Sequence, residues 1–138
     1  MIHHIVRMSL RPDVPAEQVR SALAQIQEAG SQVTPASNGS FGRDVGGDFD
    51  FAAVSSFATL EEYEEMMNHP AHLAVDRFGL PLVDRFVSFD ITDDPDPQVA
   101  VKIEAIHRRR FAAHPDIAEL VSRVPDYSGS GAPAPHGA

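Results

Sequence analysis

Cysteine is absent from the 138-residue sequence, which excludes disulfide bonds, thiolate metal ligands and cysteine nucleophiles. The chain also lacks any apolar run near twenty residues, the length that crosses a membrane as a helix. Basic residues are few: 11 Lys and Arg stand against 20 Asp and Glu, and the formal net charge of −9 argues against nucleic-acid binding. The N-terminus lacks the charged-then-apolar layout of a signal peptide. We therefore expect a cytoplasmic protein that binds neither nucleic acid nor membrane.

Apolar residues are present in two clear patterns. In residues 1–10 they alternate, with His4, Val6 and Met8 on one face, as in a strand. In residues 15–29 they recur at helical spacing. The same reasoning along the whole chain predicts four strands and the helices between them. The strands are expected at residues 1–10, 40–45 (weak), 49–57 and 82–92. The helices are expected at 15–29 and, in two pieces, at 59–68 and 71–78.

This order is the split βαβ pattern of a ferredoxin-like α+β domain. It predicts an antiparallel four-stranded sheet with the helices on one face. In the last strand, alternation places Asp84, Phe86, Ser88 and Asp90 on one face and Val83 with Val87 on the other. The face without helices has apolar residues of its own, and we expect a second copy of the chain to cover it, giving a homodimeric α/β barrel.

The composition of the sequence changes after Thr92. Residues 93–97 read as a linker, and helical spacing returns in 99–112 and again after His114-Pro115. The last residues are rich in Gly, Ser, Pro and Ala, which predicts disorder. We therefore divide the chain into a domain at 1–93, a helical extension at 94–127 and a disordered tail at 128–138. The extension could wrap the partner subunit, close a pocket or bind another protein.

Two histidines flank a proline in His69-Pro70-Ala71-His72. A neutral imidazole in an apolar cavity can remove a proton near neutral pH, which makes His72 the candidate general base. The alternative is a surface or packing histidine. His69 precedes a proline that suits a first helical turn, so we interpret His69 as a cap.

A third histidine, His4, shares its strand face with Val6 and Met8, so it should be buried or line a cavity. Asp90, near the end of the last strand, is its candidate partner, because a buried carboxylate needs a donor to stay charged. The alternative is a core histidine that only satisfies a hydrogen bond.

Cofactor and metal motifs are not found in the sequence. His3 and His4 point to opposite faces of a strand and cannot chelate together, and there is no HExxH pattern. Gly46-Gly47 is not followed by a helix, and no dinucleotide fingerprint or nucleophile elbow occurs. We expect no cofactor and no metal.

Several segments together resemble the stress-responsive A/B barrel (Dabb) family. The resemblance covers about residues 1–93 and rests on the segments 4–11, 50–57, 62–72 and 89–90. It implies a ferredoxin-like protomer in a dimeric barrel. The family includes olivetolic acid cyclase-type polyketide cyclases, which use the histidine matching His72 as base, assisted by a tyrosine. Met66 stands at the position of that tyrosine, Tyr63 lies one turn earlier, and Phe51 replaces another cavity histidine.

From residues and resemblance together we predict a cofactor-independent enzyme of polyketide-type secondary metabolism. It would be a cyclase that closes a ring by aldol or Claisen chemistry on a carbonyl-rich or aromatic small molecule. His72 would be the base, His4 would orient the substrate or stabilise an enolate, and Asp90 would fix a histidine tautomer. The expected pocket residues are Val6, Met8, Leu23, Phe51, Ala53, Tyr63, Met66 and Phe86. The alternatives are a non-catalytic dimeric stress-response or binding module and a cofactor-free monooxygenase on aromatic polyketides, a link at the level of fold analogy.

Overall fold

Strand β1, Ile2–Leu10, lies at the centre of the sheet in the computed structural model, which describes residues 1–33 and 38–130. It pairs antiparallel with β3, Phe51–Phe57, on one side and with β4, Val83–Thr92, on the other. Strand β2, Asn38–Arg43, pairs antiparallel with β3 at the edge. The order β2-β3-β1-β4 is the ferredoxin-like order, so the predicted fold class is confirmed.

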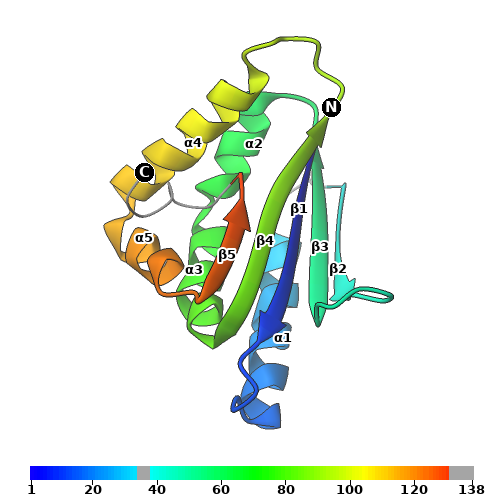
Figure 1. Ribbon diagram of the computed structural model, residues 1–138, viewed down its shortest axis with the longest axis vertical. Coiled ribbons are helices and arrows are strands. Elements are labelled where there is room, and N and C mark those ends of the chain that lie inside the picture. The colour runs from blue at the N-terminus through cyan, green and yellow to red at the C-terminus, as the bar shows by residue number, and fades with distance from the viewer. Residues whose placement is uncertain (34–37, 131–138) are drawn as a thin grey trace.

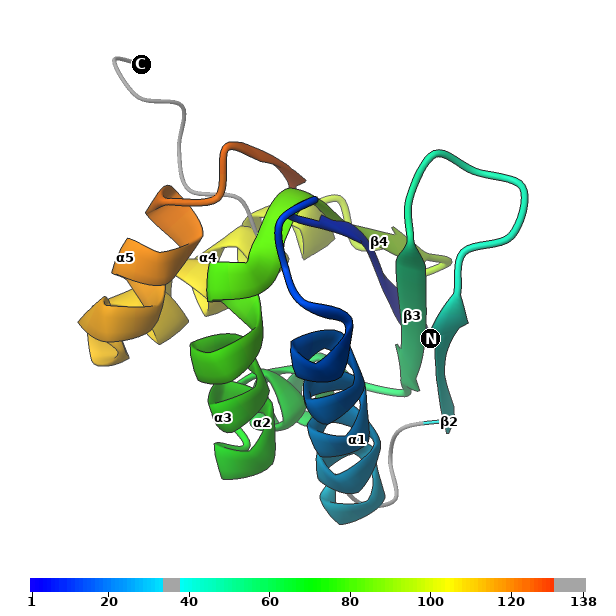
Figure 2. The same ribbon diagram turned by 90° about the horizontal axis from the view of Figure 1, so that it is seen from below.

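Three helices from the first part of the chain lie on one face of this sheet (Figures 1 and 2): α1, Ala16–Gln32; α2, Leu60–Met67; and α3, Pro70–Gly79. Helix α2 begins at a capping box, in which Thr59 Oγ1 accepts from the Glu62 amide at 3.2 Å. Helix α3 begins at His69, whose Nδ1 accepts from the Ala71 amide at 3.1 Å, as the cap interpretation predicts. Helix α1 continues to Gln32, three residues beyond the predicted end at residue 29.

A bulge changes the side-chain alternation at the start of β4, after the short 3₁₀ turn Leu80–Leu82. Ser9 lies opposite Arg85, but Leu10 lies opposite Val83, so one residue of β4 is extra. Val83 therefore turns to the helix-covered side and is 2% exposed. Our assignment of Val83 to the same face as Val87 was wrong, because strict alternation does not foresee a bulge.

The extension contains α4, Val99–Ala113, and α5, Pro115–Ser122, close to the predicted helices. It then returns to the sheet as β5, Asp126–Gly129, parallel to β4. Over the described residues the sheet is thus five-stranded and mixed, which corrects the prediction of four antiparallel strands. It also corrects the predicted disorder at 128–130. The remaining tail, 131–138, lies outside the described residues.

Close packing fixes the end of β5. Gly129 has φ of 111°, and a Cβ there would lie 1.6 Å from the Ser88 carbonyl oxygen. The next residue, Ser130, donates its amide to the same oxygen at 2.7 Å. A side chain at position 129 would break this contact, so glycine is required where the extension joins the sheet.

The core has two apolar clusters, and each combines the first part of the chain with the extension. One contains Ile2, Phe57, Tyr63, Met67, Ile103 and Ile106; the other contains Leu73, Leu80, Val83, Ile117, Val121 and Val124. The apolar stripes of α4 and α5 therefore pack on their own protomer. No helix among the described residues is long and apolar enough to span a membrane.

The second face of the sheet has no helix over it (Figure 2). Register places Ile5 of β1 opposite Val54 of β3 and Phe89 of β4 on this face. Val54 and Phe89 are each 36% exposed, and Ile91 is 55% exposed. We call this surface, defined by Ile5, Val54, Val87, Phe89 and Ile91, the open face.

Candidate functional site

A cavity of about 420 Å³ lies between the covered face of the sheet and helices α1 and α3. Strand β1 contributes His4, Val6 and Met8, because these alternate residues point toward the helices. Among the predicted pocket residues, those that line it are Val6, Met8, Ala53, Met66 and Phe86. His4 and His72 both line it as well. The structure thus brings the two candidate histidines to one cavity.

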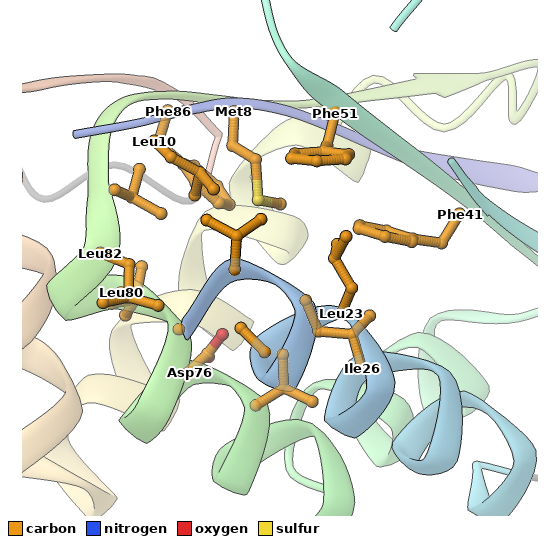
Figure 3. A pocket seen from close by; sticks show the side chains of 15 residues that line it. Met8, Leu10, Leu23, Ile26, Phe41, Phe51, Asp76, Leu80, Leu82 and Phe86 are labelled. Carbon is orange, nitrogen blue, oxygen red and sulfur yellow. The ribbon is translucent and has the colours of Figure 1, made fainter. Parts of the chain in front are cut away.

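A smaller apolar pocket of about 50 Å³, which we call the apolar arm, adjoins this cavity and shares Met8, Phe41 and Phe86 with it (Figure 3). Leu23 and Phe51, two further predicted pocket residues, line this part rather than the main cavity. Leu23 and Ile26 of α1 face Phe41 and Phe51 of the sheet across it (Figure 3). Asp76 is the one charged residue in its lining. This arm can accept apolar groups and offers little to a polar one.

A third, polar chamber of about 30 Å³ lies on the other side of the histidines. It shares five residues with the main cavity: His4, Val6, His72, Asp76 and Phe86. Its other lining residues are Met67, Leu80, Ser88, His107, Arg110, Val121 and Tyr127. Asp76 and Phe86 line all three spaces, so Asp76 stands at the junction between the apolar arm and the polar chamber.

His72 is held by its own neighbourhood in one tautomer. Its Nδ1 lies 3.1 Å from the carbonyl oxygen of Met66, which can only accept, so Nδ1 carries the proton. Nε2 is then unprotonated and lies 3.8 Å from Asp76 Oδ1, one helical turn along α3. Burial lowers the pKa of His72, although the carboxylate of Asp76 opposes this. The result is a neutral imidazole with a free lone pair.

His4 is held differently, by a charged partner. Its Nδ1 donates to Asp90 Oδ1 at 2.8 Å, and both side chains are buried. The two residues lie opposite each other on β1 and β4, which is why the predicted partners meet. Asp90 also accepts from Ser130 Oγ at 2.5 Å. Burial is the largest single influence on the pKa of Asp90 and would raise it, but the hydrogen bonds from His4 and Ser130 and the charge interaction with His4 together outweigh burial, so the pKa is lowered.

Tyr63 lies behind His4 and does not line these cavities, which corrects its assignment to the pocket wall. It is 0% exposed, because it points into the core cluster from the inner side of α2. Its hydroxyl lies 3.2 Å from His4 Nδ1 and 2.8 Å from His107 Nε2. The tyrosine hydroxyl therefore shares one hydrogen bond with His107 Nε2 and lies within the same buried group as His4 and Asp90. Burial raises the pKa of Tyr63 and lowers the pKa of His107 to about 4, so both are neutral at pH 7.

Sequence reasoning missed Asp76, His107 and Arg110. Asp76 could have been found, because it follows His72 by four residues on one helical face. The other two belong to the basic run His107-Arg108-Arg109-Arg110, in which the sequence pattern does not distinguish buried from exposed residues. The structure shows that His107 and Arg110 are buried, while Arg108 and Arg109 are exposed. Within the part of the chain that the structure describes, no three His, Asp or Glu residues gather as metal ligands.

The model of the stress responsive A/B barrel domain family matches residues 2–93. No curated protein matches the chain. The match ends before α4, so His107, Arg110 and Ser130 lie outside the segment that matches the family.

Three solved structures illustrate the likeness of fold. A dimeric ferredoxin-like protein of unknown function from Thermobifida fusca is 24% identical, with 66% of this chain and 89% of that chain covered and a TM-score of 0.59. A Dabb family protein from Mesorhizobium loti is 22% identical, with 67% and 96% covered and a TM-score of 0.58. A hydroxynitrile lyase from Passiflora edulis is 17% identical, with 67% and 94% covered and a TM-score of 0.56. At these identities the likeness establishes the fold.

Proposed function

This chain belongs to the stress responsive A/B barrel family, and on that premise we propose that it is a cofactor-independent enzyme that removes a proton beside a carbonyl group. The observation that carries the proposal is the pair of His4 and His72 in one cavity, with the unprotonated Nε2 of His72 available as the base. We place the reaction among ring closures of the aldol or Claisen type on polyketide-like molecules.

The reaction follows from the two histidine environments. Nε2 of His72 takes a proton from the carbon next to a carbonyl, and the electron pair of the C–H bond moves to the carbonyl oxygen as an enolate. Asp76, 3.8 Å away, stabilises the imidazolium that forms. His4, which Asp90 holds through Nδ1, is the residue that orients the carbonyl group and stabilises the enolate oxygen. The enolate carbon then bonds to a second carbonyl carbon, and His72 returns its proton to the new alkoxide.

The shape of the site favours a largely apolar substrate. Outside the histidines and Asp76, the walls of the main cavity are mostly aliphatic and aromatic, and the adjoining arm has one charged residue. A carbonyl-rich end would lie at the histidines and an apolar end in the arm. The cavity also supports an enzyme over a non-catalytic binding module. For such a module we would expect a filled core and an exposed His72.

We propose that the active form is a homodimer paired through the open face. Phe89 and Ile91 expose apolar surface there, and such a patch on a single protomer is typical of an interface. The similar protein from Thermobifida fusca is described as dimeric. Mass measurement of the purified chain in solution tests this directly.

The test of the reaction uses an N-acetylcysteamine thioester of a poly-β-keto acid in D₂O. NMR follows deuterium entry at the acidic carbon, and mass spectrometry follows ring closure. Wild type should accelerate both processes over buffer, and His72→Ala should lose the acceleration. His69→Ala is the matched control, because His69 caps the same helix and lines none of the three cavities.

Equal rates for wild type and His72→Ala would contradict the proposal. Oxygen uptake with a hydroxyaromatic substrate, without proton exchange, would instead favour the monooxygenase. No rate above buffer with any of these compounds would favour the binding module.

A further inference from the structure

The extension sends one charged side chain into the site from outside the segment that matches the family. Arg110 of α4 is 4% exposed and lines the polar chamber together with His72 and Asp76. A buried guanidinium is costly unless every donor has a partner, so its place next to the candidate base needs an explanation.

We propose that Arg110 is a positioning residue of the reaction: it holds Asp76 beside His72 and so keeps His72 in the form that accepts a proton. This inference rests on the proposed function. It assigns to the extension a part in the chemistry, in addition to its part in the core.

The contacts of the guanidinium connect the two segments that flank His72. Its Nε donates to the carbonyl oxygen of Met67 at 2.7 Å, and its Nη2 donates to the carboxylate of Asp76. Met67 is the last residue of α2 and follows Met66, whose carbonyl oxygen fixes the tautomer of His72. The guanidinium therefore anchors Asp76 directly, and it anchors the residue next to Met66, whose carbonyl oxygen fixes the tautomer of His72. A lysine ammonium cannot reproduce this planar, two-point contact.

The charges around His72 show how Arg110 acts on it. Asp76 lies on its own helix, Arg110 and His107 approach from α4, His4 approaches from β1, and Tyr127 of β5 lines the same chamber. The positive charge of Arg110 lowers the pKa of His72. Arg110 also pairs with Asp76, which weakens the attraction of that carboxylate for a proton on His72. Without Arg110, Asp76 would pair with His72 alone and favour the protonated imidazole, which is no base.

The neighbouring residue supplies a matched control. Arg109 is 59% exposed at the surface of the same helix and pairs with Glu64 at 2.7 Å. Substitution of Arg109 or of Arg110 by glutamine removes one arginine and one ion pair from α4. Of these two arginines, only Arg110 lines the polar chamber.

The experiment measures the protonation of His72 by NMR in the full chain labelled on histidine, with the His72 signal assigned by its loss in His72→Ala. Arg110→Gln should raise the pKa of His72 by about one unit, and Arg110→Lys, which keeps a charge, by less. Arg109→Gln should leave the pKa unchanged. If Arg110→Gln does not fold, Arg110→Lys against Arg109→Lys decides, because a loss of the fork alone should still move the pKa upward.

An unchanged pKa in both Arg110 variants would overturn the inference, even where wild type is active on the thioester. If wild type is active, the acid limb of kcat/KM in Arg110→Gln should also move to higher pH by the same amount, and an unmoved limb would overturn the inference. If the pKa moves but wild type and His72→Ala convert the thioester equally, the proposed function fails and the role of Arg110 in the reaction fails with it.

Discussion

The two faces of the central sheet differ in what they bury. On the covered face, polar groups lie in apolar surroundings, and each has a fixed partner: His4 with Asp90, His72 with Met66, Tyr63 with His107. On the open face, apolar side chains such as Phe89 and Ile91 meet solvent in the protomer. Buried titratable groups with fixed hydrogen-bond partners are typical of active sites. Exposed apolar patches are typical of protein–protein interfaces. Substitutions on the two faces should therefore have separable effects.

The largest effect is expected on the covered face. His72→Ala should lower kcat/KM for proton removal by about 10²- to 10⁴-fold, the range that a general base supplies. His69→Ala should lower the free energy of unfolding by about 1 kcal/mol, the usual contribution of an N-cap. Its kcat/KM should stay close to that of wild type. A large loss of kcat/KM in the His69 variant would contradict this division of roles.

On the open face, Phe89→Asp should weaken self-association. A charge at the centre of an apolar interface should raise the dimer dissociation constant by about 30-fold or more, the effect of losing a hot spot worth about 2 kcal/mol. Sedimentation measures the constant. Val101→Asp is the control, because Val101 is 57% exposed on α4, away from the open face. Equal dissociation constants for Phe89→Asp and wild type would contradict an interface on the open face.

The buried network behind the cavity should make folding stability depend on pH. The folded-state pKa of His107 is about 4, below the ordinary value near 6.5. As pH falls below 6.5 the unfolded chain binds a proton at His107 and the folded chain does not, so stability is lost between pH 6.5 and 4. From pH 7.5 to 5 this amounts to about 2 kcal/mol.

Urea unfolding at both pH values measures the loss, and His107→Gln should show a smaller pH dependence than wild type. A pH dependence that is the same in both proteins would show that His107 is not buried in the neutral form.

The smallest effect concerns Tyr63. Tyr63→Phe leaves Nε2 of buried His107 without its hydrogen-bond partner and should lower the unfolding free energy by about 1 to 2 kcal/mol. Because Tyr63 does not line the cavity, kcat should change little. A loss of kcat as large as that of His72→Ala would mean that the tyrosine hydroxyl reaches the substrate, against its placement behind His4.

The sequence could predict those parts of the molecule that depend on local pattern. Alternation in β1 places His4, Val6 and Met8 toward one cavity, and the capping signals at Thr59 and His69 place α2 and α3. The contact between His4 and Asp90 was predicted as well, and it forms because the two residues lie opposite each other on β1 and β4.

The missed parts depend on distant contacts. Strand β5 is four residues long and has no apolar run, so only its parallel pairing with β4 reveals it. The bulge that buries Val83 is likewise set by pairing. Arg110 meets Asp76 across 34 residues of sequence, and nothing in the pattern of a basic cluster distinguishes a buried arginine from its exposed neighbours.

The central claim is that His72 presents an unprotonated Nε2 to the cavity at neutral pH. Nitrogen NMR of labelled wild type from pH 4 to 8 tests it, because the two ring nitrogens give different signals when protonated. We expect a neutral ring with its proton on Nδ1 and a titration midpoint below about 6.5, the ordinary value for histidine. A proton on Nε2 in the neutral ring, or a midpoint above that value, would contradict the account of His72 as the base.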